Sequence, residues 1–71
     1  MNRINPEKLY QSKWTSLQVK RKERHFIVRK LFRSDDETII GIELEAIINN
    51  NVYKIDWQQL KDSSIWITGW K

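Results

Sequence analysis

The sequence predicts a small all-β protein in which five short strands form a strongly bent antiparallel sheet or an SH3-like barrel. Three observations support this fold class: segments that alternate between apolar and polar residues, turn-forming residues between those segments, and four tryptophans in only 71 residues. Each tryptophan buries roughly 150–250 Å², so together they can supply much of so small a core. Closure would also remove exposed strand edges. A flat sheet covered by the N-terminal turn is the alternative.

Residues 1–71 are expected to form a single domain without covalent or metal support. The chain has no cysteine, which excludes disulfides, thiol nucleophiles and cysteine-ligated metals. No segment resembles a signal peptide or a membrane span, so we expect a cytoplasmic protein with no membrane partner. The net charge of +4 divides into +8 in residues 1–33 and −4 in residues 34–71. The two parts attract each other, and a residual basic surface is one consequence of this asymmetry.

The N-terminal third predicts a helical turn and then an interrupted strand. Asn5-Pro6-Glu7 provides a cap, a proline suited to the first helical position and an acidic residue near the positive end of the dipole. Residues 13–19 favour a strand, but their alternation slips part of the way along. A β-bulge near Thr15 or Ser16 would restore the alternation.

The middle of the chain predicts two paired strands. Residues 25–33 are apolar on both faces, Asp35-Asp36-Glu37 favours a turn, and residues 40–48 alternate more regularly than any other segment. An antiparallel register in which opposite residue numbers sum to 72 matches size and charge. It sets Phe26 beside Ala46, Val28 beside Leu44, Phe32 beside Ile40 and Arg29 across from Glu43.

Three asparagines at 49–51 predict a tight hairpin, because asparagine tolerates positive φ. With Asn50-Asn51 as the loop, each apolar residue of the preceding strand meets an apolar partner: Ile48 meets Tyr53, Ala46 meets Ile55 and Leu44 meets Trp57. The same register sets Glu45 opposite Asp56. Either a basic neighbour neutralises this acidic patch, or the patch binds a cation or a basic partner. Residues 58–61 then predict a helical turn, 62–64 a loop and 65–70 a last short strand.

The sequence offers little catalytic chemistry. His25 is the only histidine, and the chain contains none of the common nucleophile, phosphate-loop or zinc-protease motifs. We therefore expect a surface or cross-strand histidine, no enzymatic activity, no metal and no cofactor.

We expect instead a binding module for an unidentified protein partner, either a monomer or a weak homodimer. Several apolar residues lie outside the phase of the predicted core, which favours an interaction surface. The candidates are Ile27, Leu31, Ile47, Trp66 and Trp70.

The alternative is binding of RNA or single-stranded DNA through the basic hairpin at residues 20–25 and an exposed tryptophan. Basic side chains can follow phosphates while indole rings stack on bases. A charged hairpin tip is also typical of a solvated turn. The candidate residues are Lys13, Lys20, Arg21, Lys22, Arg24 and Arg29.

Motifs along nearly the whole chain resemble those of a small family of stand-alone bacterial tryptophan-rich proteins. They are Ile4-Asn5-Pro6, Ser12-Lys13-Trp14-Thr15, His25-Phe26, Leu44-Glu45-Ala46, Ile55-Asp56-Trp57, Leu60-Lys61-Asp62 and Trp66 with Gly69-Trp70. The resemblance implies no assigned activity, substrate or cofactor. Gln58 departs from the pattern, since the resemblance implies a basic residue beside Trp57.

Overall fold

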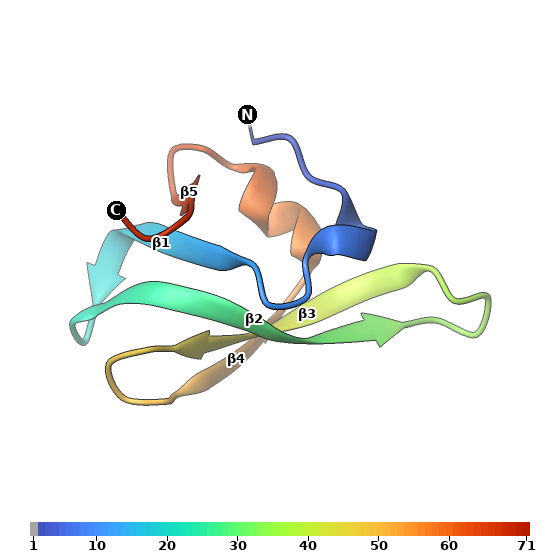
Figure 1. Cartoon of the computed structure of the whole chain (residues 1–71), viewed down its shortest axis with the longest axis horizontal. Helices are drawn as coiled ribbons and strands as arrows, with labels where there is room; N and C mark the ends of the chain where they lie inside the picture. Colours follow the sequence, from blue (N-terminus) through green and yellow to red (C-terminus); the bar gives the residue numbers. More distant parts are fainter. Residues whose placement is uncertain (1) are drawn as a thin grey trace.

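The computed structural model describes residues 2–71, which form an open five-stranded antiparallel sheet with two 3-10 turns (Figure 1). Neighbouring strands follow the order β4-β3-β2-β1-β5. The elements are η1 (Pro6–Lys8), β1 (Lys13–Lys20), β2 (Glu23–Arg33), β3 (Ile39–Ala46), β4 (Val52–Ile55), η2 (Trp57–Lys61) and β5 (Trp66–Thr68). The predicted all-β class and the five antiparallel strands are confirmed.

The predicted strong bend and the SH3-like barrel are wrong. β4 and β5 are the two edges of the sheet and do not pair with each other. The chain that joins them passes through η2, whose Leu60 is fully buried in the core. Because this connection lies against one face of the sheet, it keeps the two edges apart. The principal extents of 37 × 26 × 15 Å accordingly describe a slab.

The core lies between one face of the sheet, here called the core face, and the two 3-10 turns. In Figure 1, η1 (dark blue) and η2 (orange) are drawn near each other above β2 and β3. Burial of apolar area is the main stabilising contribution in so small a domain. The buried cluster consists of Leu9, Trp14, Phe26, Val28, Ile42, Leu44, Ala46 and Leu60.

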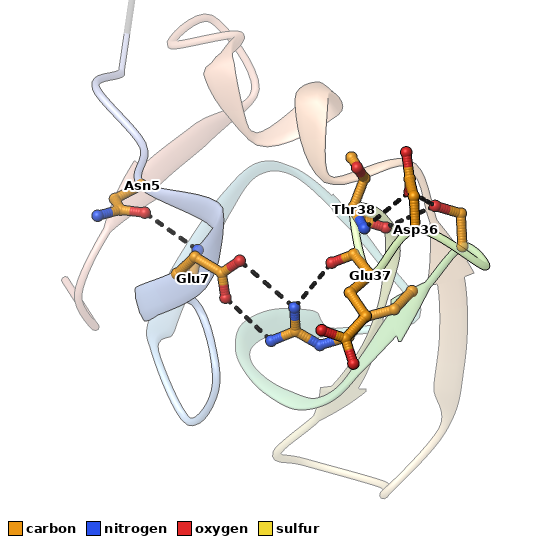
Figure 2. Close-up of polar contacts among 7 residues, drawn as sticks. Asn5, Glu7, Asp36, Glu37 and Thr38 are labelled. Atoms are coloured by element: carbon orange, nitrogen blue, oxygen red, sulfur yellow. Dashed lines mark hydrogen bonds and ion pairs between the residues drawn. The ribbon is translucent and has the colours of Figure 1, made fainter.

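The N-terminal turn forms as predicted, and it is attached to the β2–β3 hairpin. The Asn5 side chain accepts a hydrogen bond from the Glu7 backbone N–H at 3.1 Å. The Glu7 carboxylate in turn accepts two hydrogen bonds from Arg33, at 2.9 and 3.3 Å, and Arg33 also donates to the Glu37 carbonyl oxygen at 3.0 Å. Figure 2 shows Glu7 and Glu37 meeting at this guanidinium group. The contact fixes η1 against the β2–β3 hairpin.

The register between β2 and β3 is correct over its first half only. Phe26 faces Ala46 and Val28 faces Leu44, as predicted. The register then shifts by one residue between Val28 and Lys30, so Phe32 faces Gly41 instead of Ile40. This irregularity at Arg29 changes which side chains face the core.

The register predicted between β3 and β4 is wrong. Leu44 faces Tyr53 and Ile42 faces Ile55. Each β3 residue therefore faces a residue four positions earlier in the chain than the partner predicted with a two-residue loop. A shift by an even number keeps every side chain on its face. The loop spans residues 47–51 and is closed by a hydrogen bond from the Asn50 N–H to the Ala46 carbonyl oxygen at 2.8 Å. Trp57 therefore begins η2 and does not pair with Leu44.

The predicted irregularity in the first strand is confirmed, because the β1–β2 register shifts between Thr15 and Lys20. The turn that follows contains only two residues. Arg21 and Lys22 have φ values of 54° and 64°, which are the values that a tight hairpin turn of the primed type requires. β5 is shorter than the predicted strand at 65–70, and η2 matches the predicted helical turn. No helix in residues 2–71 has the length and apolar character needed to cross a membrane.

Candidate binding groove

An open groove of about 390 Å³ lies on the core face, at the end of the sheet that η1 and η2 leave uncovered. Its floor is formed by Phe26 and Leu44 from the two central strands. Its walls come from the two edges of the sheet: Tyr53 and Ile55 on β4, and Ile65 and Trp66 at β5. The strands alternate apolar and polar residues, so apolar side chains point to the core face. Where η1 and η2 do not cover that face, these side chains line the groove.

Three aromatic rings give the groove a defined shape. The Trp66 ring meets Phe26 edge to face, with centroids 5.4 Å apart and an interplanar angle of 77°. Tyr53 meets Phe26 from the other side at 6.3 Å and 65°. Edge-to-face pairs stabilise by roughly 0.5–1.5 kcal/mol beyond area burial. Phe26 is only 6% exposed, so it is a fixed floor.

A buried carboxylate closes one end of the groove. Glu23 is only 5% exposed, although it lies within the basic segment 20–25. The Tyr53 hydroxyl donates to its two carboxylate oxygens, at 2.6 and 2.8 Å. The side-chain amides of Asn49 and Asn51 donate to Oε2 at 2.8 and 2.9 Å. We call these four residues the Glu23 clasp, since they join the tip of the β1–β2 hairpin to the β3–β4 loop and to β4.

The clasp changes the acidity of two of its members. The pKa of Glu23 is lowered from its ordinary value, chiefly because the Tyr53 hydroxyl donates to the charged form, followed by the Asn49 amide. The pKa of Tyr53 is raised for the reciprocal reason, because its proton is held by the carboxylate. Near neutral pH the clasp therefore consists of an ionised glutamate held by neutral donors.

Basic side chains lie at the mouth of the groove beside the clasp. Lys20 and Arg21 line it together with Gln18, and all three are exposed. Arg21 is near enough to Glu23 to lower the pKa of that carboxyl further. Within residues 2–71 neither Lys20 nor Arg21 takes part in an ion pair.

The six basic residues proposed for nucleic-acid binding do not form one site. Lys20, Arg21, Lys22 and Arg24 are exposed around the β1–β2 tip. Lys13 lies at the opposite end of β1 from Lys20. The seven residue steps of extended strand between them correspond to about 23 Å.

Arg29, the sixth basic candidate, is engaged by acidic neighbours. The predicted pairing of Arg29 with Glu43 across the strands is wrong, because the register shift sets Lys30 opposite Glu43. The Arg29 side chain nevertheless reaches both acidic neighbours: its Nε lies 3.2 Å from a Glu43 carboxylate oxygen, and its Nη1 lies 3.7 Å from one of Glu45. Such partly exposed pairs stabilise by less than about 1 kcal/mol, yet they reduce the charge that Arg29 can offer a ligand.

The five residues proposed for protein interaction are not brought together: Ile47 is exposed in the β3–β4 loop, and the other four divide between the two faces of the sheet. Leu31 and Trp66 pack against the core cluster, and Trp66 also lines the groove. The expectation that Leu31 points away from the core is wrong, because the register shift at Arg29 turns it. Ile27 lies half-buried beside Lys13 on the other face, here called the outer face.

Trp70 is the most accessible tryptophan, at 42% exposure. Its Nε1–H donates to the Phe26 carbonyl oxygen at 2.9 Å, and Lys13 Nζ lies 4.7 Å from its ring centroid. The His25 ring lies 6.1 Å from the indole, and His25 faces Thr15 across the strands, which agrees with the expected cross-strand histidine. Trp70 therefore lies on the outer face, away from the groove.

The predicted opposition of Glu45 and Asp56 does not occur. Glu45 faces Val52, and Asp56 caps η2 by accepting a hydrogen bond from the Gln58 N–H at 2.9 Å. In residues 2–71, no group of three or more histidine, cysteine, aspartate or glutamate side chains is arranged to hold a metal ion.

Sequence reasoning missed the Glu23 clasp and hence the groove. Glu23 lies within the basic segment 20–25 and received no prediction of its own, and the asparagines were predicted only to form a turn. One signal was present, because an acidic residue at the tip of a basic hairpin suggests a local partner. The donors come from 26 to 30 residues further along the chain, so no spacing rule could identify them.

The fold and groove define a small open-faced β-sheet protein with an uncovered apolar site. The chain belongs to the family described as tryptophan-rich protein (DUF2389), whose model matches residues 12–71. The resemblance drawn from the sequence motifs is thus confirmed, and no function is assigned to the family. No curated protein and no solved structure matches the chain.

Proposed function

We propose that this protein is a small interaction module whose groove binds an apolar segment of a partner protein. The observation that carries the proposal is the uncovered end of the core face, where Tyr53, Ile55 and Trp66 stay only half-buried around a buried Phe26. Tryptophan and tyrosine in a preformed pocket are the side chains most often responsible for binding energy at interfaces. A volume of about 390 Å³ falls within the usual range of ligand pockets.

The proposal can be tested with a displayed library of random dodecapeptides and the immobilised full chain. A selected peptide should bind the wild-type chain, and Ile65→Lys should weaken binding by about tenfold or more because it places a charge on an apolar wall. Ile40→Lys is the matched control, since Ile40 is exposed and does not line the groove. Denaturation curves of both variants establish that they fold. Failure to select any peptide, or equal losses in the two variants, would refute the proposal.

A second candidate function is binding of single-stranded nucleic acid at the β1–β2 tip. It is favoured by one observation, the four exposed basic side chains Lys20, Arg21, Lys22 and Arg24, none of which forms an ion pair within residues 2–71. Each contact with a phosphate of a single strand should add about −0.7 to the slope of log affinity against log salt. Titration with a single-stranded RNA at several salt concentrations tests it. A slope unchanged by Lys22→Gln with Arg24→Gln, or no binding at low salt, would exclude the tip as a site.

A further inference from the structure

We infer that the groove selects peptides in which a carboxylate stands beside the apolar anchor, with the carboxylate at the Lys20 and Arg21 end. This inference rests on the proposed function and adds the chemistry of the partner. It follows from the two-ended composition of the groove, which is apolar around Phe26 and Trp66 and basic at its mouth.

The buried Glu23 does not make the groove a cation site. Its carboxylate already accepts hydrogen bonds from Tyr53, Asn49 and Asn51, and little of it is accessible. An approaching cation would also meet the like charges of Lys20 and Arg21 at the mouth.

The two basic side chains are free to pair with a ligand. Both are exposed, and neither is held by an ion pair within residues 2–71. At this end of the groove, the two positive charges of Lys20 and Arg21 exceed the single negative charge of Glu23. Charge complementarity of this kind determines which partner binds more than how tightly it binds.

The apolar end favours a peptide side chain over a nucleic-acid base. Bases bind aromatic residues by stacking on an open ring face. Phe26, on the floor of the groove, is almost fully covered, so its ring offers no open face to a base. The groove lining also includes the aliphatic side chains of Leu44, Ile55 and Ile65, which suit a leucine-sized or phenylalanine-sized anchor.

The test compares a selected peptide with its counterpart in which the acidic residues next to the anchor are changed to amides. Fluorescence anisotropy of the labelled peptides gives both affinities. The wild-type chain should prefer the acidic form by about tenfold at low salt, and the preference should decrease as salt is raised. Lys20→Gln combined with Arg21→Asn should bind the two forms equally. Asparagine is chosen at position 21 because it tolerates the positive φ found there.

Lys8→Gln combined with Lys30→Gln removes the same amount of charge outside the groove, and this control should keep the preference. Equal binding of both peptide forms by the wild type, or selection of basic peptides, would overturn the inference while leaving the groove a protein-binding site. Failure to select peptides would instead remove the proposed function. Single-stranded RNA is also tested as a competitor of the bound acidic peptide. If RNA displaces the peptide from the wild type but not from the Lys20/Arg21 variant, the basic residues bind phosphate, and the inference is overturned.

Discussion

The two ends of the core face are stabilised in different ways. Under η1 and η2, Leu9 and Leu60 are buried and fill the space above the sheet. At the other end Tyr53 and Trp66 stay half-buried, because neither 3-10 turn of residues 2–71 covers them, and the hairpin tips are held by hydrogen bonds to the carboxylate of Glu23. The polar clasp holds the hairpin tips together without filling the space between the strands, which leaves the groove open.

The largest expected effect is at the covered end. Leu60→Ala should lower the free energy of unfolding by roughly 2–5 kcal/mol, because it empties a fully buried site in the centre of the core. Ile55→Ala at the open end should cost clearly less, since Ile55 is only half-buried. Urea denaturation followed by circular dichroism measures both. Leu17→Ala, at an exposed site, serves as the control and should change stability by less than about 0.5 kcal/mol. Equal losses at positions 55 and 60 would contradict the comparison.

Breaking the clasp should have a smaller effect on stability than emptying the core. In Glu23→Gln the new amide can still accept from Tyr53, but its NH₂ group cannot accept the hydrogen bonds that Asn49 and Asn51 now donate. We expect a lower melting temperature and faster amide hydrogen exchange confined to the two hairpin tips. Uniformly faster exchange throughout the sheet would show that Glu23 supports the whole fold.

The clasp should also be sensitive to acid. The pKa of Glu23 is lower in the folded than in the unfolded chain, so the carboxylate contributes stability above its unfolded value of about 4.3. That contribution is lost as the pH falls through the folded value. The stability difference between wild type and Glu23→Gln should therefore be greatest near neutral pH and decrease below about pH 4. Glu7, Asp36 and Asp62 also have lowered pKa values, but they titrate in both proteins and cancel in the difference. A difference independent of pH would exclude the ionised form as the source of the stabilisation.

A smaller effect on stability is expected at Trp70, which belongs to neither end of the core face. Trp70→Phe removes one hydrogen bond to the Phe26 carbonyl oxygen and should cost about 1 kcal/mol. It should nevertheless remove most of the fluorescence that acrylamide quenches readily, because the other indoles are less exposed. Trp14→Phe is the contrasting variant, since Trp14 is buried and its loss should leave that quenching unchanged. Unchanged quenching in Trp70→Phe would place the accessible indole elsewhere.

Patterns contained within a few neighbouring residues predicted their local structure well. The cap at Asn5 and the irregularity after Thr15 both agree with the structure. Of the longer-range predictions, the first half of the β2–β3 register also agrees. The β3–β4 register was wrong because the asparagines at 49–51 were assigned only to a turn. The side chains of Asn49 and Asn51 instead donate to Glu23 from a loop that spans residues 47–51.

Local sequence patterns are enough to predict an all-β chain with antiparallel strands, because alternation and turn residues act over short separations and do not depend on the rest of the fold. The open sheet follows from long-range packing, since it depends on η2 and the buried Leu60 lying across its face. The groove has the same origin. The sequence does not show whether an apolar side chain is buried or exposed, because the residues that would cover it lie far along the chain.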